Sequence, residues 1–151
     1  MALDGSSRNR INNNRFSSLR NGGIYLYRNC GEGGTIRHTP PERNTITNNS
    51  FYYKKYTGRK PAIYLGSRDY GRAKDIVGHC GDDRGRSYGS SRSNEDYARH
   101  NIIKNNKLSK RQIANAGPSG FPRSATVEDM IVTKNKSTNS PNDISDNRLV
   151  E

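Results

Sequence analysis

The sequence predicts an α+β protein in which a small antiparallel sheet, at about residues 15–77, precedes short helices, at about residues 93–132. An Asn-Gly dipeptide between two β-type runs is typical of a hairpin. Serine-led helix-start signals appear only in the second half of the chain. Both ends are polar and lack apolar periodicity. We therefore expect a flexible basic arm at 1–14, a single domain at 15–132 and a disordered polar tail at 133–151.

The sheet is predicted from four apolar or aromatic runs. Asn21-Gly22 separates residues 16–19 from residues 24–27, which places these two runs on the strands of a hairpin. Residues 51–56 and 62–65 are further strand candidates, because they are rich in tyrosine, phenylalanine and isoleucine.

The helices are predicted from capping boxes. Ser93 is followed three residues later by an acid, and Ile102 with Ile103 adds a narrow apolar stripe. Ser109 is followed by a glutamine at the same spacing, and residues 125–132 form a third short helical element. We see no internal repeat in the sequence.

The composition limits the classes of function. Leu, Ile, Val and Phe make up 24 of the 151 residues, whereas the formal net charge is +12. So thin a core argues against a deep enzyme pocket and favours a chain that is stabilised by a polyanionic partner. No apolar run reaches the length of a membrane span, and the N-terminus has no apolar signal core. We expect an intracellular protein, with a virion or a ribonucleoprotein as fitting locations, and no membrane partner.

The first candidate nucleic-acid contact is an arginine-rich segment. No acidic residue occurs between Gly5 and Gly31, and the segment contains five arginines: Arg8, Arg10, Arg15, Arg20 and Arg28. Arginine binds phosphate through a planar fork and stays charged at physiological pH. The segment resembles the RNA-binding arms of small viral coat proteins and the extensions of ribosomal proteins. The alternative is that this segment is a solvated tail whose composition has arisen by chance.

Two further segments combine cations with tyrosines. The predicted strand contributes Tyr52, Tyr53, Lys54, Lys55 and Tyr56. A Gly/Ser-rich loop contributes Arg84, Arg86, Tyr88 and Arg92. Tyrosine rings can stack on bases while the cations contact phosphates. An ordinary half-buried strand and a surface loop are the alternatives. Together these residues predict a non-catalytic protein that binds nucleic acid, RNA in preference to DNA, as a component of a ribonucleoprotein or another large assembly.

A structural role is the first alternative function. A basic arm in front of a β-rich region also fits a coat protein whose main contacts are with copies of itself.

Residues 107–117, with Ile113-Ala114 before Gly117, resemble the first helix and turn of a helix-turn-helix, which would make residues 124–130 the recognition helix.

An enzymatic role is the second alternative. Gly23-Ile24-Tyr25 and Tyr64-Leu65-Gly66 are similar to the signature of the GIY-YIG nucleases. The resemblance implies metal-dependent phosphodiester hydrolysis by Tyr25, Tyr64, Arg72 and Glu95.

The cysteines suggest no cofactor. Cys30 and Cys80 lack a CxxC spacing, and a zinc site would have to recruit ligands from His38, His79 and His100. We expect two reduced thiols and no metal or cofactor, with a single Cys30–Cys80 disulfide left open.

Overall fold

The computed structural model describes residues 1–29, 37, 39–53, 60–66, 98–109, 126–133 and 141–150. These ranges contain twelve short strands and a single helix, α2 (Val127–Met130). The strands form three sheets of four strands each, and every pair of neighbouring strands is parallel. We name the sheets A, B and C.

Each sheet takes one strand in three along the chain. Sheet A contains β1 (Ala2–Asp4), β4 (Ile24–Tyr27), β7 (Ile63–Leu65) and β10 (Ile131–Thr133). Sheet B contains β2 (Arg10–Asn12), β5 (Thr45–Thr47), β8 (Ile102–Lys104) and β11 (Asp143–Ser145). Sheet C contains β3 (Arg15–Leu19), β6 (Ser50–Tyr53), β9 (Lys107–Ser109) and β12 (Arg148–Val150).

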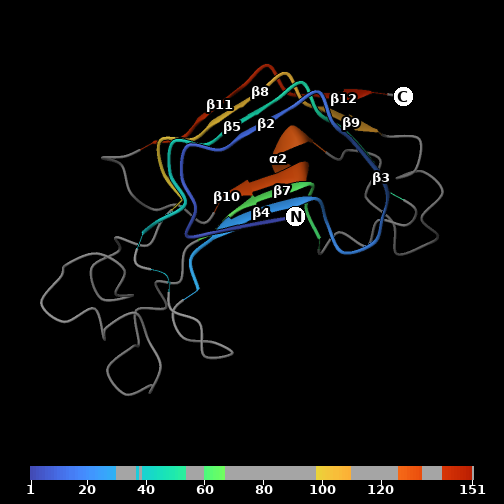
Figure 1. Ribbon diagram of the computed structural model, residues 1–151. Helices are drawn as coiled ribbons and strands as arrows, with labels where there is room; N and C mark the ends of the chain where they lie inside the picture. The colour runs from blue at the N-terminus through green and yellow to red at the C-terminus, as the bar shows by residue number, and fades with distance from the viewer. Residues whose placement is uncertain are drawn as a thin grey trace, which may run out of the picture.

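The chain therefore passes through sheets A, B and C in turn, and does so four times. We call each passage a rung, so that β1–β3 form the first rung and β10–β12 the fourth. Figure 1 shows the strands of sheet B stacked over those of sheet A. This arrangement is a parallel β-helix. The predicted antiparallel sheet followed by helices is wrong.

The predicted hairpin fails because its turn connects different sheets. The strands on either side of Asn21-Gly22 are β3 in sheet C and β4 in sheet A, and they do not pair with each other. Gly22 has a φ of +87°, and a Cβ there would lie 2.7 Å from the carbonyl oxygen of Pro61. The glycine is thus required by the corner. A local turn signal does not reveal whether the flanking strands share a sheet.

The predicted helices fail for a related reason. Ile102 and Ile103 lie on strand β8, where Ile103 is fully buried and Ile102 is 41% exposed. Two adjacent apolar residues therefore point to opposite faces of a strand instead of sharing a helical stripe. Ser109 ends β9, so the first helix of the helix-turn-helix resemblance begins on a strand. In the element predicted at 125–132, only four residues are helical before β10 begins.

Both chain ends contribute strands, in contrast to the arm and tail that we predicted. The first fourteen residues include β1 and β2, and the last nineteen include β11 and β12. The N-terminal amino group of Met1 donates a hydrogen bond to the carbonyl oxygen of Gly23, 2.8 Å away. The ends thus form the outer layers of the stack.

An internal repeat underlies the rungs, although we saw none in the sequence. It has an asparagine, an inward isoleucine two residues later, a second asparagine at the sixth position, and Phe or Leu at the eighth. The four copies begin at Asn9, Asn44, Asn101 and Asn142. Neighbouring copies are separated by 35, 57 and 41 residues. These unequal insertions remove any constant period.

The second asparagine of the repeat marks the corner between sheets B and C. The residue before it adopts a left-handed backbone in every copy, with φ between 56° and 59°: Asn13, Asn48, Asn105 and Asp146. Asn and Asp tolerate this conformation better than other non-glycine residues. The sequence therefore bends the chain at the same point in all four rungs.

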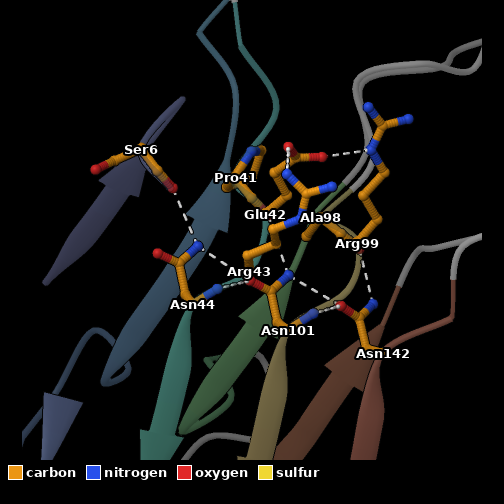
Figure 2. Close-up of polar contacts among 9 residues, drawn as sticks. All are labelled: Ser6, Pro41, Glu42, Arg43, Asn44, Ala98, Arg99, Asn101 and Asn142. Carbon is orange, nitrogen blue, oxygen red and sulfur yellow. Dashed lines mark hydrogen bonds and ion pairs between the residues drawn. The ribbon is translucent and has the colours of Figure 1, made fainter. Parts of the chain in front are cut away.

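Each asparagine of the repeat bonds to its equivalent in the next rung. Asn44 donates from its backbone N–H (2.9 Å) and from Nδ2 (3.0 Å) to Oδ1 of Asn101, and Asn101 does the same to Asn142. Figure 2 shows Asn44, Asn101 and Asn142 of this first ladder, in which Nδ2 of Asn44 also donates to the backbone oxygen of Ser6. A second ladder runs through Asn14, Asn49, Asn106 and Asn147. Because all their polar atoms are engaged, the interior asparagines are fully buried at little cost.

The apolar core consists of columns that follow the same stacking. Ile11, Ile46 and Ile103 share one register position in sheet B, and the rings of Phe16 and Phe51 stack in sheet C with centroids 4.8 Å apart. That distance equals the spacing of neighbouring strands, about 4.8 Å. Few apolar residues therefore suffice, because each short strand sends only one or two inward.

Within the described ranges there is no helix of the length and apolarity that spanning a membrane requires.

Candidate nucleic-acid interface

Four of the five arginines of the arginine-rich segment lie on one rung. Arg8, Arg10, Arg15 and Arg20 are all exposed and belong to the first rung or its corners. Within the described part of the chain none of them forms an ion pair with a carboxylate. The described carboxylate of this rung, Asp4, contacts Arg37 at 3.1 Å. The first rung therefore presents a strongly basic rim.

One of these arginines continues into a basic row along sheet C. Arg15, Ser50, Lys107 and Arg148 occupy the same register position on the four strands. The three cations are exposed, and Lys107 lies directly opposite Arg148. Strands about 4.8 Å apart place these charges in a line along the axis of the β-helix. Like charges that face each other across strands repel, so a bound anion would relieve the repulsion.

No carboxylate compensates this row within the described residues. The outward positions of sheet C otherwise hold serines, Tyr52 and Val150. Lys107 and Arg148 form no ion pair in the part of the chain that the structure covers. We call Arg15, Tyr52, Lys107 and Arg148 the sheet C face.

Tyr52 lies against the first cation of the sheet C face. The guanidinium carbon of Arg15 is 4.3 Å from the centroid of the Tyr52 ring. Tyr52 is half-buried, so the ring is held in place and part of it remains accessible. A cation–π contact of this kind orients both side chains at low entropic cost for a ligand. The pair could contact a phosphate and a base together.

On strand β8 of sheet B, Lys104 is already paired with a carboxylate. Nζ of Lys104 lies 2.6 Å from Oδ2 of Asp143 on the neighbouring strand. This hydrogen bond raises the pKa of the Lys104 ammonium above its ordinary value. The fixed pairing makes sheet B a poorer surface for an external anion than the sheet C face.

The corner before sheet B also contains paired charges. Figure 2 shows Glu42 between two arginines. Its carboxylate accepts a hydrogen bond from Nε of Arg99 at 2.8 Å and lies 3.5 Å from a terminal nitrogen of Arg43. Arg43 and Arg99 are therefore already paired with a carboxylate, unlike the cations of the sheet C face.

Two predicted contact residues lie inside the protein. Arg28 is fully buried, and its Nε donates a hydrogen bond to the backbone oxygen of Arg37. Tyr53 is fully buried, and its hydroxyl donates to the backbone oxygen of Lys60 at 2.9 Å. The structure thus separates both from the exposed cations of sheet C. The remaining predicted residues lie outside the described ranges: Lys54, Lys55, Tyr56, Arg84, Arg86, Tyr88 and Arg92.

The two tyrosines of the nuclease resemblance are neighbours in sheet A. Tyr25 and Tyr64 face each other in register, and their ring centroids are 5.6 Å apart. Burial raises the pKa of the Tyr25 hydroxyl, and repulsion from Tyr64 adds to the shift. The other two proposed catalytic residues, Arg72 and Glu95, lie outside the described residues, as do Cys30 and Cys80. Nowhere in the described ranges do three or more His, Cys, Asp or Glu side chains gather as metal ligands would.

Sequence reasoning missed Lys107 and Arg148. Both follow the second asparagine of the repeat directly, as Arg15 does in the first copy. Aligning the four copies by their asparagine pairs would have placed all three in one column.

No protein-family model, curated protein or solved structure matches this chain.

Proposed function

We propose that this protein binds nucleic acid without catalysis, as part of a larger assembly, through the sheet C face and the rim of the first rung. The observation that carries the proposal is the row of Arg15, Lys107 and Arg148, which is exposed and has no compensating carboxylate among the described residues. A line of cations along a flat sheet suits the backbone of a polyanion, and releasing its counterions drives binding.

Tyr52 favours a single strand as the ligand. A duplex hides the faces of its bases, whereas a single strand can stack a base on an aromatic ring. Proteins recognise RNA mostly through such unpaired segments, so we favour RNA over DNA. The Arg15–Tyr52 pair would then hold one nucleotide while Lys107 and Arg148 hold the phosphates that follow.

The test is the salt dependence of RNA binding. We would titrate a fluorescent single-stranded oligouridine with the protein, follow anisotropy at several salt concentrations, and compare wild type with the triple variant Arg15→Gln/Lys107→Gln/Arg148→Gln. Each lost phosphate contact should make the slope of log K against log salt shallower by about 0.7, hence by about 2 for the triple variant.

The matched control removes the same charge elsewhere. The variant Arg37→Gln/Arg43→Gln/Lys104→Gln neutralises three cations that are paired with Asp4, Glu42 and Asp143. We expect its salt slope to stay close to that of wild type. Equal losses in the two triple variants would mean that net charge, and not the sheet C face, produces the binding, and would contradict the proposal.

A second variant tests the stacking. Tyr52→Leu keeps an apolar side chain but removes the ring, and base–aromatic stacking contributes about 1–3 kcal/mol per base. We expect weaker RNA binding with an unchanged salt slope. If duplex RNA binds as well as the single strand, and Tyr52→Leu changes neither, the single-stranded ligand is excluded.

A further inference from the structure

The two asparagine ladders end in complementary groups. In the interior, every backbone N–H of a ladder asparagine donates to Oδ1 of the next rung. At the fourth rung, the backbone N–H groups of Asn142 and Asn147 have no acceptor among the described residues. At the first rung, no described group donates to Oδ1 of Asn9 or Asn14. One end thus offers donors and the other acceptors, at the same two corners.

The rims of the two ends carry opposite charge. The first rung has four exposed arginines: Arg8, Arg10, Arg15 and Arg20. The fourth rung, with its preceding helix, has four exposed carboxylates, of which Asp143 also pairs with Lys104 of the third rung: Glu128, Asp129, Asp143 and Asp146. Arg148 is the exposed cation among the described residues of that rung. The charge complementarity therefore runs along the axis of the β-helix.

Part of the fourth-rung end is open. Helix α2 packs against the core through Val127, and Ile131 of sheet A is only 5% exposed. Figure 1 shows α2 between the layers of β10 and β11. On the side of sheet B, by contrast, the inward-facing Ile144 is 38% exposed. A hollow of about 650 Å³ lies between α2, β10 and the end of β11. The free edges of β11 and β12 are therefore the part of this end that can accept another strand.

We propose that copies of this protein associate head to tail, with the β11–β12 edge of one copy on the β2–β3 edge of the next. Continuing the register of sheet B places Asp143 of one copy beside Arg10 of the next. It also brings Asn142 onto Asn9 and Asn147 onto Asn14, which supplies the missing acceptors. Because the two surfaces differ, the contact is heterologous, and stacking along the axis of the β-helix leaves both ends of the row of copies open. This association goes beyond the proposed nucleic-acid binding.

One pair in this arrangement is repulsive. The register of sheet C places Arg148 of one copy beside Arg15 of the next, and facing like charges weaken a strand pair. Nucleic acid on the sheet C face would lie over the same two residues. The structure thus assigns Arg148 opposite effects on the two kinds of binding.

The experiment is sedimentation of the full chain after nuclease treatment and a high-salt wash. At low salt we expect the mean mass to rise continuously with protein concentration. A monomer at every concentration up to the solubility limit, or a dimer that grows no further, would overturn the proposal.

Charge reversal identifies the surfaces. Arg10→Glu and Asp143→Lys should each weaken self-association about fivefold, because an attractive cross-strand pair becomes repulsive. An equimolar mixture of the two variants should associate again, since each supplies the partner that the other needs. If the mixture stays monomeric while both variants have the circular dichroism spectrum of wild type, the Arg10–Asp143 contact is wrong.

The substitution Arg148→Glu separates this proposal from the nucleic-acid proposal. It should strengthen self-association about fivefold and weaken binding of oligouridine. Weaker self-association would overturn the head-to-tail register. Unchanged RNA binding would contradict only the role of the sheet C face.

Discussion

The first and fourth rungs of the β-helix share one backbone plan and differ in the charge at their rims. Both place an isoleucine inward on sheet B, Ile11 and Ile144, and both turn through a left-handed residue into an asparagine. The first rim is basic, whereas the fourth is rich in carboxylates. The inward residues and corner asparagines therefore determine the backbone, and the outward positions are free to specify binding.

The largest expected difference between the two rungs concerns their isoleucines. Ile11 is 7% exposed, whereas Ile144 is 38% exposed. We expect Ile11→Ala to lower the free energy of unfolding by about 3 kcal/mol, because it leaves a cavity in a packed column. Ile144→Ala should cost about 1 kcal/mol, because solvent already reaches the side chain.

Urea denaturation of both variants measures this difference, with Ile46→Ala as a fully buried reference. If Ile144→Ala costs as much as Ile46→Ala, the fourth rung is covered in solution. A second copy on that end would do this, so the measurement should be repeated at low protein concentration.

The second difference follows from the direction of the ladders. Oδ1 of Asn147 accepts from the backbone N–H and from Nδ2 of Asn106, and its Nδ2 donates to Ile103. Asn14 only donates within its ladder, to Oδ1 of Asn49. We therefore expect Asn147→Ala to destabilise by about 2 kcal/mol, because buried groups lose their partners, and Asn14→Ala by less than about 1 kcal/mol.

The midpoints of urea unfolding at a constant m-value provide the comparison. Equal losses at the two ends would mean that the ladders have no energetic direction. They would then support the fold without encoding which end is which.

Strand positions could be predicted from the sequence, but their pairing could not. The runs at 24–27, 51–56 and 62–65 were predicted as strands, and within the described residues the structure confirms 24–27 as β4, 51–53 as part of β6 and 63–65 as β7. Short apolar runs indicate a strand wherever it pairs. Which strands pair is set by the corner asparagines, because each asparagine stacks on its equivalent in the next rung. The separations of 35, 57 and 41 residues between these asparagines are unequal, so the repeat is hard to recognise in the sequence.

The candidate site was predictable in part for the same reason. The exposed arginines of the first rung stand out in the sequence, because no acid interrupts them. The burial of Arg28 could not be inferred, because its Nε contacts the backbone oxygen of Arg37, nine residues further along the chain. Lys107 and Arg148 are unremarkable locally and join Arg15 only through the stacking of the rungs.

The rims should differ in their response to polyanions. Arg8→Gln/Arg20→Gln should make the salt slope of oligouridine binding shallower by about 1.4, if each arginine contacts one phosphate. Glu128→Gln/Asp146→Gln should leave the slope unchanged, because carboxylates release no nucleic-acid counterions. Anisotropy titrations at several salt concentrations distinguish them. A shallower slope for Glu128→Gln/Asp146→Gln would mean that nucleic acid binds near the fourth rung, which would contradict the proposed site.

The smallest expected effect concerns the pH dependence of the fourth rung. Hydrogen bonds from its own backbone N–H and then from Thr126 lower the pKa of Glu128 below the ordinary value of 4.5. A carboxyl whose pKa is lowered by folding stabilises the protein fully above 4.5, and this contribution disappears as the pH falls through the lower folded value. Glu128→Gln should therefore lower stability slightly at neutral pH, leave it unchanged in acid, and so reduce the loss of stability as the pH falls through 4.5. Because the group is exposed, the effect should be a small shift in the urea midpoint. A variant that still loses as much stability in acid as wild type does would contradict this role of Glu128.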